Sequence, residues 1–141
     1  MTGSAGLFFD ENWGLPITQA IGGLVRFRKP HLTVLHKAEF LGGLGEKDEI
    51  WIPELAKSKP HWLVVTGDQG KGKGEKLPVL CRHYGLRHIL LRGKLHNRRQ
   101  FDRACAVFAV WRDIEEAFAS GPGARFHLQL RQKTAKLTHV G

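Results

Sequence analysis

The chain contains few cysteines and no long apolar run. Its two cysteines, Cys81 and Cys105, lie inside apolar patterns, so we expect buried thiols in a reducing cytoplasm. The longest apolar stretches are far shorter than a membrane-spanning helix, and we therefore expect no membrane segment. Near the N-terminus the run GLFF leads directly into Asp10 and Glu11, so we expect no secretory signal there.

Acidic residues are also scarce relative to basic ones. The 141 residues include 22 Lys and Arg against 13 Asp and Glu, which gives a formal net charge of +9. This balance favours a polyanionic partner, chiefly nucleic acid, because cationic side chains neutralise phosphates and release counterions. A basic domain with no nucleic-acid role is the alternative. The length suits one domain, and we expect it over residues 1–133, followed by a basic, flexible tail over residues 134–141.

Short apolar runs alternate with amphipathic segments along the chain. The apolar runs predict buried strands at Leu7–Phe9, Leu32–Leu35, Trp62–Thr66 and His88–Leu91. The segments between and after them predict helices at Pro16–Leu24, Asp48–Lys57, Leu77–Tyr84 and Arg98–Ser120. Alternation of apolar and polar residues in ARFHLQLRQ, from Ala124, predicts a last strand at an edge. This order indicates an α/β fold, a mostly parallel sheet with helices on both faces.

Three aspartates stand at the ends of predicted elements. Asp10 ends the first strand, Asp68 follows the third, and Asp48 begins a helix. Strand ends of a parallel sheet meet at one edge, so we expect Asp10 and Asp68 to converge, with Asp48 close by. Clustered carboxylates repel one another unless a hard cation such as Mg²⁺ or Mn²⁺ neutralises them. Structural roles are the alternatives: a helix N-cap for Asp48 and a turn for Asp68.

The segments LFFDENW, DEIWIPELA and HWLVVTGDQ, taken together, resemble PIN-like domains of the VapC toxin type. They occur in the same order and at natural spacing within residues 7–70. The resemblance implies a three-layer α/β/α sandwich with a central, mostly parallel sheet and an acidic pocket that binds Mg²⁺ or Mn²⁺. It further implies metal-dependent cleavage of RNA and, often, a cognate antitoxin protein that blocks the site. A homodimer is left open.

The resemblance assigns roles residue by residue. The catalytic and metal-binding acids are Asp10, Asp48 and Asp68. The resemblance also assigns Thr66 as the hydroxyl beside the third acid. Beside these, we expect Asn12 and Glu49 to support the site, with a turn as the alternative role of Asn12. Many PIN domains have a fourth acid, but no motif in this chain assigns one.

A glycine-lysine loop follows the third predicted strand. From Gly67 it runs G-x-x-x-x-G-K, as in a nucleotide-binding P-loop, but Gly74 stands where the Ser or Thr that ligates magnesium is required. We instead expect Lys71 and Lys73 to hold substrate phosphate beside the acids, with a solvated linker as the alternative. Further nucleic-acid-binding residues are predicted at Arg98 and Arg99.

Two other functions compete with the nuclease. In the first, the chain is a non-catalytic nucleic-acid-binding module with a degenerate acidic site. In the second, a receiver-like phosphoaspartate domain uses Asp10 with Glu11, Asp68 and Lys94 at successive strand ends. The net charge of +9 and the glycine-lysine loop disfavour the receiver. Zinc is disfavoured because the histidines and cysteines lack paired ligand spacing.

Overall fold

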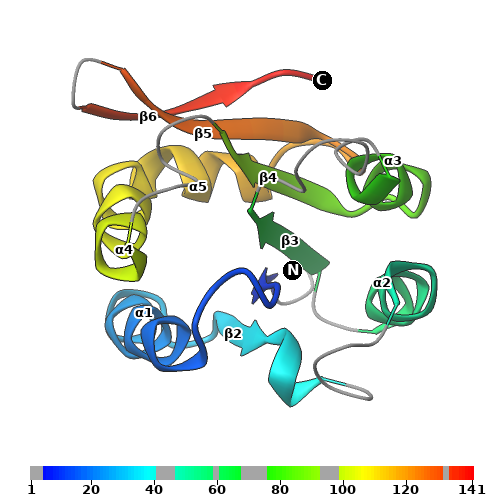
Figure 1. The fold of residues 1–141 in the computed structure, drawn as a ribbon, viewed down its shortest axis with the longest axis horizontal. Coiled ribbons are helices and arrows are strands. Elements are labelled where there is room, and N and C mark those ends of the chain that lie inside the picture. The colour runs from blue at the N-terminus through cyan, green and yellow to red at the C-terminus, as the bar shows by residue number, and fades with distance from the viewer. Residues whose placement is uncertain (1–4, 41–46, 59–60, 68–75, 93–98, 132–133) are drawn as a thin grey trace.

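A six-stranded sheet forms the centre of the molecule (Figure 1). The computed structural model describes residues 5–40, 47–58, 61–67, 76–92, 99–131 and 134–141. The strands, in the spatial order β2-β1-β3-β4-β5-β6, are β1 (Ala5–Phe9), β2 (Thr33–His36), β3 (His61–Thr66), β4 (Arg87–Leu91), β5 (Arg125–Arg131) and β6 (Thr134–His139). Strands β1 to β5 pair in parallel, and β6 pairs antiparallel with β5.

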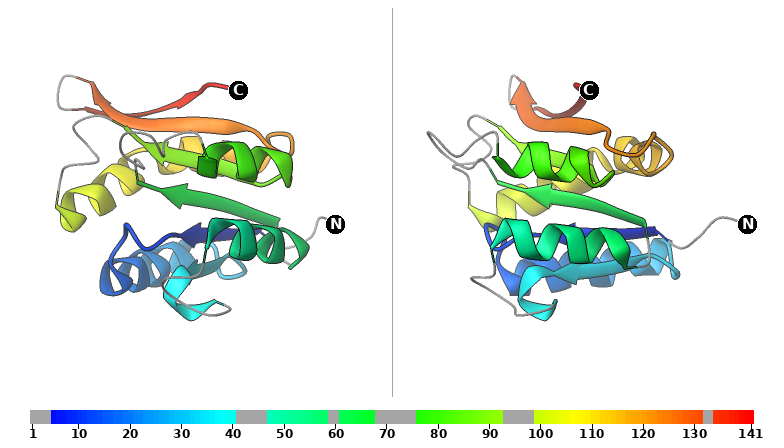
Figure 2. Two further views of the ribbon diagram at one scale, coloured as in Figure 1. Left: turned by 45° about the vertical axis from the view of Figure 1, so that its right-hand side comes forward. Right: turned by 90° about the vertical axis from the view of Figure 1, so that its right-hand side faces the viewer.

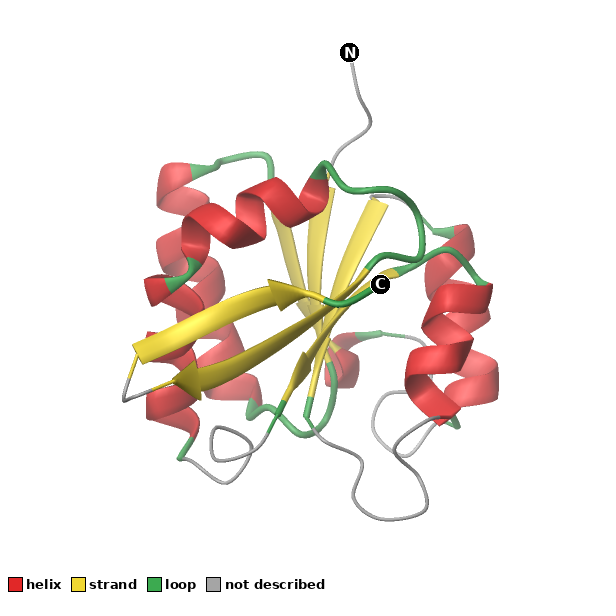
Figure 3. Ribbon diagram, turned by 90° about the horizontal axis from the view of Figure 1, so that it is seen from above, coloured by secondary structure: helices red, strands yellow, loops and turns green. Residues whose placement is uncertain are grey.

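Helices cover both faces of the sheet, which makes three layers (Figure 3). They are α1 (Leu15–Arg28), α2 (Asp48–Lys57), α3 (Lys76–His83), α4 (Gln100–Ala109) and α5 (Trp111–Phe118), with a short 3₁₀ turn, η1 (Lys37–Glu39), after β2. Helices α1, α4 and α5 pack on one face, and α2 and α3 lie together on the other (Figure 2). The expected α/β fold with its mostly parallel central sheet is confirmed.

Each layer has its own apolar core because neighbouring strand residues point to opposite faces. In β1, Leu7 and Phe9 join the core under α1, α4 and α5, whereas Phe8 joins the core under α2 and α3. Phe8 stacks on Trp51 of α2, with ring centroids 5.1 Å apart. A strand that is apolar on both faces thus anchors both helical layers, and it lies between β2 and β3, second from the edge of the sheet.

The first four predicted strands and the first three predicted helices are confirmed, and α2 has the predicted bounds. The single helix predicted over Arg98–Ser120 is wrong, since the chain bends at Val110 between α4 and α5. Val110 has φ −105° and ψ 21°, outside helical geometry. The hydrophobic period does not reveal this bend, because Val107 and Trp111 on either side of it enter the same core.

The C-terminal segment also differs from expectation. Instead of a flexible tail over residues 134–141, Thr134–His139 form β6, which lies at the edge in place of β5. Two small or apolar side chains, Ala135 and Leu137, pack against the larger core and anchor this strand. Such a short alternation is easily missed among the surrounding polar residues.

Among the described residues no helix is both long and apolar enough to cross a bilayer.

Candidate active site

Three strands end together at the edge where the site forms. In the sheet register Phe9 of β1 lies opposite His36 of β2 and Val65 of β3. Asp10 follows β1 and donates its backbone N–H to the Val65 carbonyl at 3.2 Å. Its position is therefore fixed by the sheet itself, at the carboxyl edge where parallel sheets form binding crevices.

The Asp10 carboxylate is buried, with only 4% of the residue exposed. It accepts two hydrogen bonds from Asn12, one from the backbone N–H and one from the side-chain amide, each 3.1 Å long. Burial raises the pKa of Asp10 to about 7, although the Asn12 hydrogen bonds oppose that shift. A buried carboxyl of this kind is stabilised by either a proton or a metal cation.

Helix α4 holds the turn that follows Asp10. Arg103 donates to the Asn12 carbonyl at 2.6 Å, and Gln100 donates to the same oxygen at 3.1 Å. The Gln100 side-chain oxygen accepts from the Gly14 N–H at 2.9 Å. A segment about ninety residues away in the sequence thus holds both ends of the turn.

His36 holds the same turn from the β2 side. Its Nδ1 accepts from the Ala38 N–H at 2.9 Å, so Nε2 carries the ring proton and donates to the Trp13 carbonyl at 2.6 Å. Glu39 completes a capping box by accepting the His36 N–H at 2.9 Å. His36 is buried and forms part of the scaffold of the site.

Asp10 and Asp48 line one hollow of about 210 Å³. Its other lining residues are Glu11, Asn12, Lys37, Trp51 and Leu77. Asp48 accepts a hydrogen bond from the Trp51 indole at 2.9 Å, which directs its carboxylate, and its charge contributes to the raised pKa of Asp10. The two carboxylates therefore lie in one electrostatic environment.

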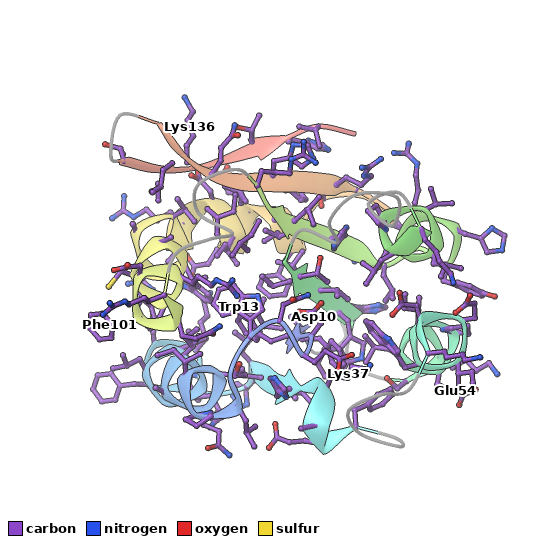
Figure 4. All side chains as sticks on the ribbon, viewed as in Figure 1. Asp10, Trp13, Lys37, Glu54, Phe101 and Lys136 are labelled. Carbon is purple, nitrogen blue, oxygen red and sulfur yellow. The ribbon has the colours of Figure 1, made fainter. Side chains whose placement is uncertain are left out.

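A buried lysine also belongs to this hollow. Lys37 is 1% exposed, and its ammonium lies 2.8 Å from the Glu11 carboxylate and 5.6 Å from the centroid of the Trp51 ring. Figure 4 shows Lys37 beside Asp10, between the sheet and α2. Lysines are almost never fully buried unless paired. The position of Lys37 could have identified it as a residue near the site, because it directly follows β2 at the same edge as Asp10.

The remaining predicted residues are placed less uniformly. Thr66 is buried at the end of β3, where its hydroxyl lies 2.7 Å from Nε2 of His88. Burial lowers the pKa of His88 to about 3, so this ring is neutral. Glu49 is outside the hollow and forms an exposed ion pair with Lys76. Arg99 is exposed, at the N-cap of α4.

Four predicted site residues, Asp68, Lys71, Lys73 and Arg98, lie outside the described part of the chain.

Asp48 is not the N-cap of α2, because Lys47 takes that position and no side chain caps it. Asp48 instead sits in the first turn, where the helix dipole favours an anion.

The residues lining the hollow fit a hydrated hard cation. In the described part of the chain no three His, Cys, Asp or Glu side chains form a group that could hold a metal. Mg²⁺, however, is commonly bound by only one or two carboxylates and keeps several waters. Asp10 and Asp48 supply two carboxylates, and the raised pKa of Asp10 marks a charge that a cation would stabilise.

A family model described as a PIN like domain matches residues 6–92, which is more than half of the chain. This range includes β2, β3 and β4, all of β1 except Ala5, and every residue lining the hollow. Searches of curated proteins and of solved structures gave no match.

Proposed function

The chain belongs to the PIN-like domain family, and we propose from this that it is a metal-dependent endoribonuclease with Asp10 and Asp48 at its active site. Membership in the family gives a nuclease-type fold. The observation that most supports the proposal is the shared hollow, where the buried Asp10 carboxylate and Asp48 lie beside one another at the carboxyl edge of the sheet. Asp68, which follows β3, is the third proposed carboxylate.

Asp10 and Asp48 would hold Mg²⁺ or Mn²⁺. When bound, such an ion would lower the pKa of a water molecule and would stabilise negative charge on an RNA phosphate. Asn12 keeps the Asp10 carboxylate oriented toward the hollow. Arg103 and Gln100 restrain Asn12, so the ligand geometry is set before substrate arrives.

The proposal is tested by cleavage of a labelled single-stranded RNA by purified protein. Cleavage is expected in Mg²⁺ or Mn²⁺ and is expected to stop in EDTA, with recovery when the ion is added back. Cleavage that persists undiminished in excess EDTA would contradict a metal-dependent mechanism.

The second candidate is a nucleic-acid-binding module without catalysis. It is favoured by the absence of a three-ligand metal group among the described residues. Its signature is tight RNA binding with no cleavage in either metal. Isothermal titration with Mn²⁺ separates the two candidates further, because a degenerate site does not bind the ion.

We further propose the VapC toxin type, with a cognate antitoxin protein as partner. The support is the set of segments LFFDENW, DEIWIPELA and HWLVVTGDQ in the sequence. Growth arrest on expression of the wild-type chain, and none on expression of Asp10→Asn, is the expected result for a toxin. Equal growth with both chains would leave a nuclease without toxin activity.

Lys37 is expected to weaken ion binding by the charge it places beside the acids. Its ammonium and a divalent cation repel each other across the hollow, and a unit charge about 8 Å from a divalent ion changes binding by about 1 kcal/mol at the dielectric constant of water. Lys37→Met preserves the buried stem and removes the charge. We therefore expect the Kd for Mn²⁺ to fall about 5-fold, as measured by calorimetry.

Lys57→Met is the matched control, because Lys57 is exposed on α2 and pairs with Glu54 instead of facing the hollow. Figure 4 shows Glu54 on the outer side of α2. An unchanged or higher Kd for Mn²⁺ in Lys37→Met, with the fold intact by circular dichroism, would contradict this role.

A further inference from the structure

The β5-β6 ribbon has two chemically different faces. One face packs against the helical layer of α4 and α5 through Phe126 and Leu128 of β5 and Leu137 of β6. Because successive side chains of a strand point to opposite faces, Arg125, His127 and Gln129 lie on the other face. The antiparallel register sets Lys136 beside Gln129 and Thr138 beside His127, so these β6 residues share that face. Within the two strands this face has basic, amide and hydroxyl residues and no apolar residue.

Positive charge is segregated onto this part of the sheet. None of the six strands contains Asp or Glu, and every Lys or Arg within a strand lies in β4, β5 or β6. Arg92 directly follows β4, is exposed, and stays beside β5 because its N–H donates to the Leu128 carbonyl at 3.0 Å. Lys136 is exposed and points away from the molecule in Figure 4. Among the described residues no ion pair includes Arg92, Arg125 or Lys136.

The basic face is continuous with the face that holds Asp10. Sheet register relates Phe8 to Val64, Val64 to His88 and His88 to Arg125, so these residues point to the same side. Asp10 lies two residues after Phe8 and continues this side at the carboxyl edge. With strands about 4.8 Å apart, β5 lies about 14 Å and β6 about 19 Å from β1. A chain bound along the basic face would pass within a few nucleotides of the hollow.

We propose that the β5-β6 basic face, consisting of Arg92, Arg125, His127, Gln129 and Lys136, binds the phosphate backbone of an RNA that enters the acidic hollow. Protein interfaces generally need buried aromatic or apolar anchors, which the strand residues of this face do not offer. Cationic and amide side chains that form no ion pair among the described residues suit phosphate oxygens instead. This inference relies on the proposed nuclease function only for naming RNA as the ligand.

The test measures binding without cleavage, in EDTA, by fluorescence anisotropy of a labelled oligouridylate. Arg92→Gln with Lys136→Gln removes two exposed charges from the face and leaves every residue lining the hollow unchanged. The control is Arg26→Gln with Arg112→Gln, which removes two exposed charges from α1 and α5, over the opposite face of the sheet. Both variants carry the same change in net charge.

The face variant is expected to raise the RNA Kd about 20-fold near 0.1 M salt and to reduce the slope of log K against log salt by about 1.4, since each single-strand phosphate contact contributes about 0.7. The control is expected to change the Kd less than about 3-fold. Equal losses in the two variants would overturn the proposal, because net charge alone would then explain them. It is likewise overturned if the face variant keeps its RNA affinity but loses binding to polyglutamate, which would assign the face to an acidic protein. Because no turnover is measured, an absence of cleavage cannot be mistaken for failure of this surface.

Discussion

Asp10→Asn is expected to lower the rate of RNA cleavage more than about 1000-fold, a loss of about 4 kcal/mol of transition-state stabilisation. Of the three acids that line the hollow, Asp10, Glu11 and Asp48, only Asp10 is buried. An amide has the same shape but no charge, so it cannot neutralise a divalent ion. The measurement is the single-turnover rate at saturating RNA and Mn²⁺.

The Asp10→Asn substitution is compatible with most of the hydrogen bonds around residue 10. The amide oxygen of the new side chain can still accept the Asn12 backbone N–H, and the scaffold hydrogen bonds from Arg103 and Gln100 involve the Asn12 carbonyl. RNA affinity in EDTA is therefore expected to stay the same or to improve, because a negative charge is removed. Asp113→Asn, an exposed acid on α5, is the matched control and should retain full activity. Wild-type turnover in Asp10→Asn would refute the assignment of Asp10.

The sequence predicted that Asp10 and Asp48 would lie close together, whereas the prediction for Asp68 falls outside the described residues. An apolar run followed directly by an acid identified Asp10, and the parallel sheet implied that the start of a nearby helix would bring in Asp48. Both inferences need only local pattern and one topological rule. The structure places the two residues on one hollow.

The scaffold of the site could not be predicted in this way, because it is built from contacts between distant segments. Arg103 reaches the Asn12 carbonyl across 91 positions, and nothing in the pattern of α4 distinguishes it from a surface arginine. Lys37 was missed for a related reason. Its burial and its place beside Glu11 in the hollow are seen only in the structure, although a buried cation beside the acids affects the same electrostatics.

Two buried groups are expected to give the metal-free protein opposing dependences of stability on pH. The pKa of Asp10 is raised by burial from 3.8 to about 7, so its contribution to stability is fully present below pH 3.8 and is lost as pH rises through about 7. The pKa of His88 is lowered by burial from 6.5 to about 3, so its contribution is present above pH 6.5 and is lost as pH falls toward 3. In the wild-type chain the two effects largely cancel between these limits.

Single substitutions separate the two contributions. Relative to Asp10→Asn, the wild-type protein should become less stable by about 1.4 kcal/mol per pH unit between pH 4 and 7, reaching a difference of about 4 kcal/mol at pH 8. His88→Gln should remove the opposing pH dependence that His88 contributes. The free energy of unfolding of this variant should therefore fall steadily as pH rises over the same range. Urea unfolding in EDTA, followed by circular dichroism at several pH values, measures both.

Divalent ions provide the decisive comparison, because an ion that binds only the folded state stabilises it in proportion to the logarithm of its concentration over Kd. At pH 8, Mn²⁺ at about 100 times its Kd should return about 2.7 kcal/mol to the wild-type protein and little to Asp10→Asn. At pH 4 the proton on Asp10 competes with the ion, and the stabilisation of the wild-type protein should largely disappear. A wild-type chain whose stability relative to Asp10→Asn does not change between pH 4 and 8 would mean that the Asp10 carboxyl is not desolvated. Competition between the proton and the ion at Asp10 would then be expected only near pH 4, the ordinary range of an aspartate.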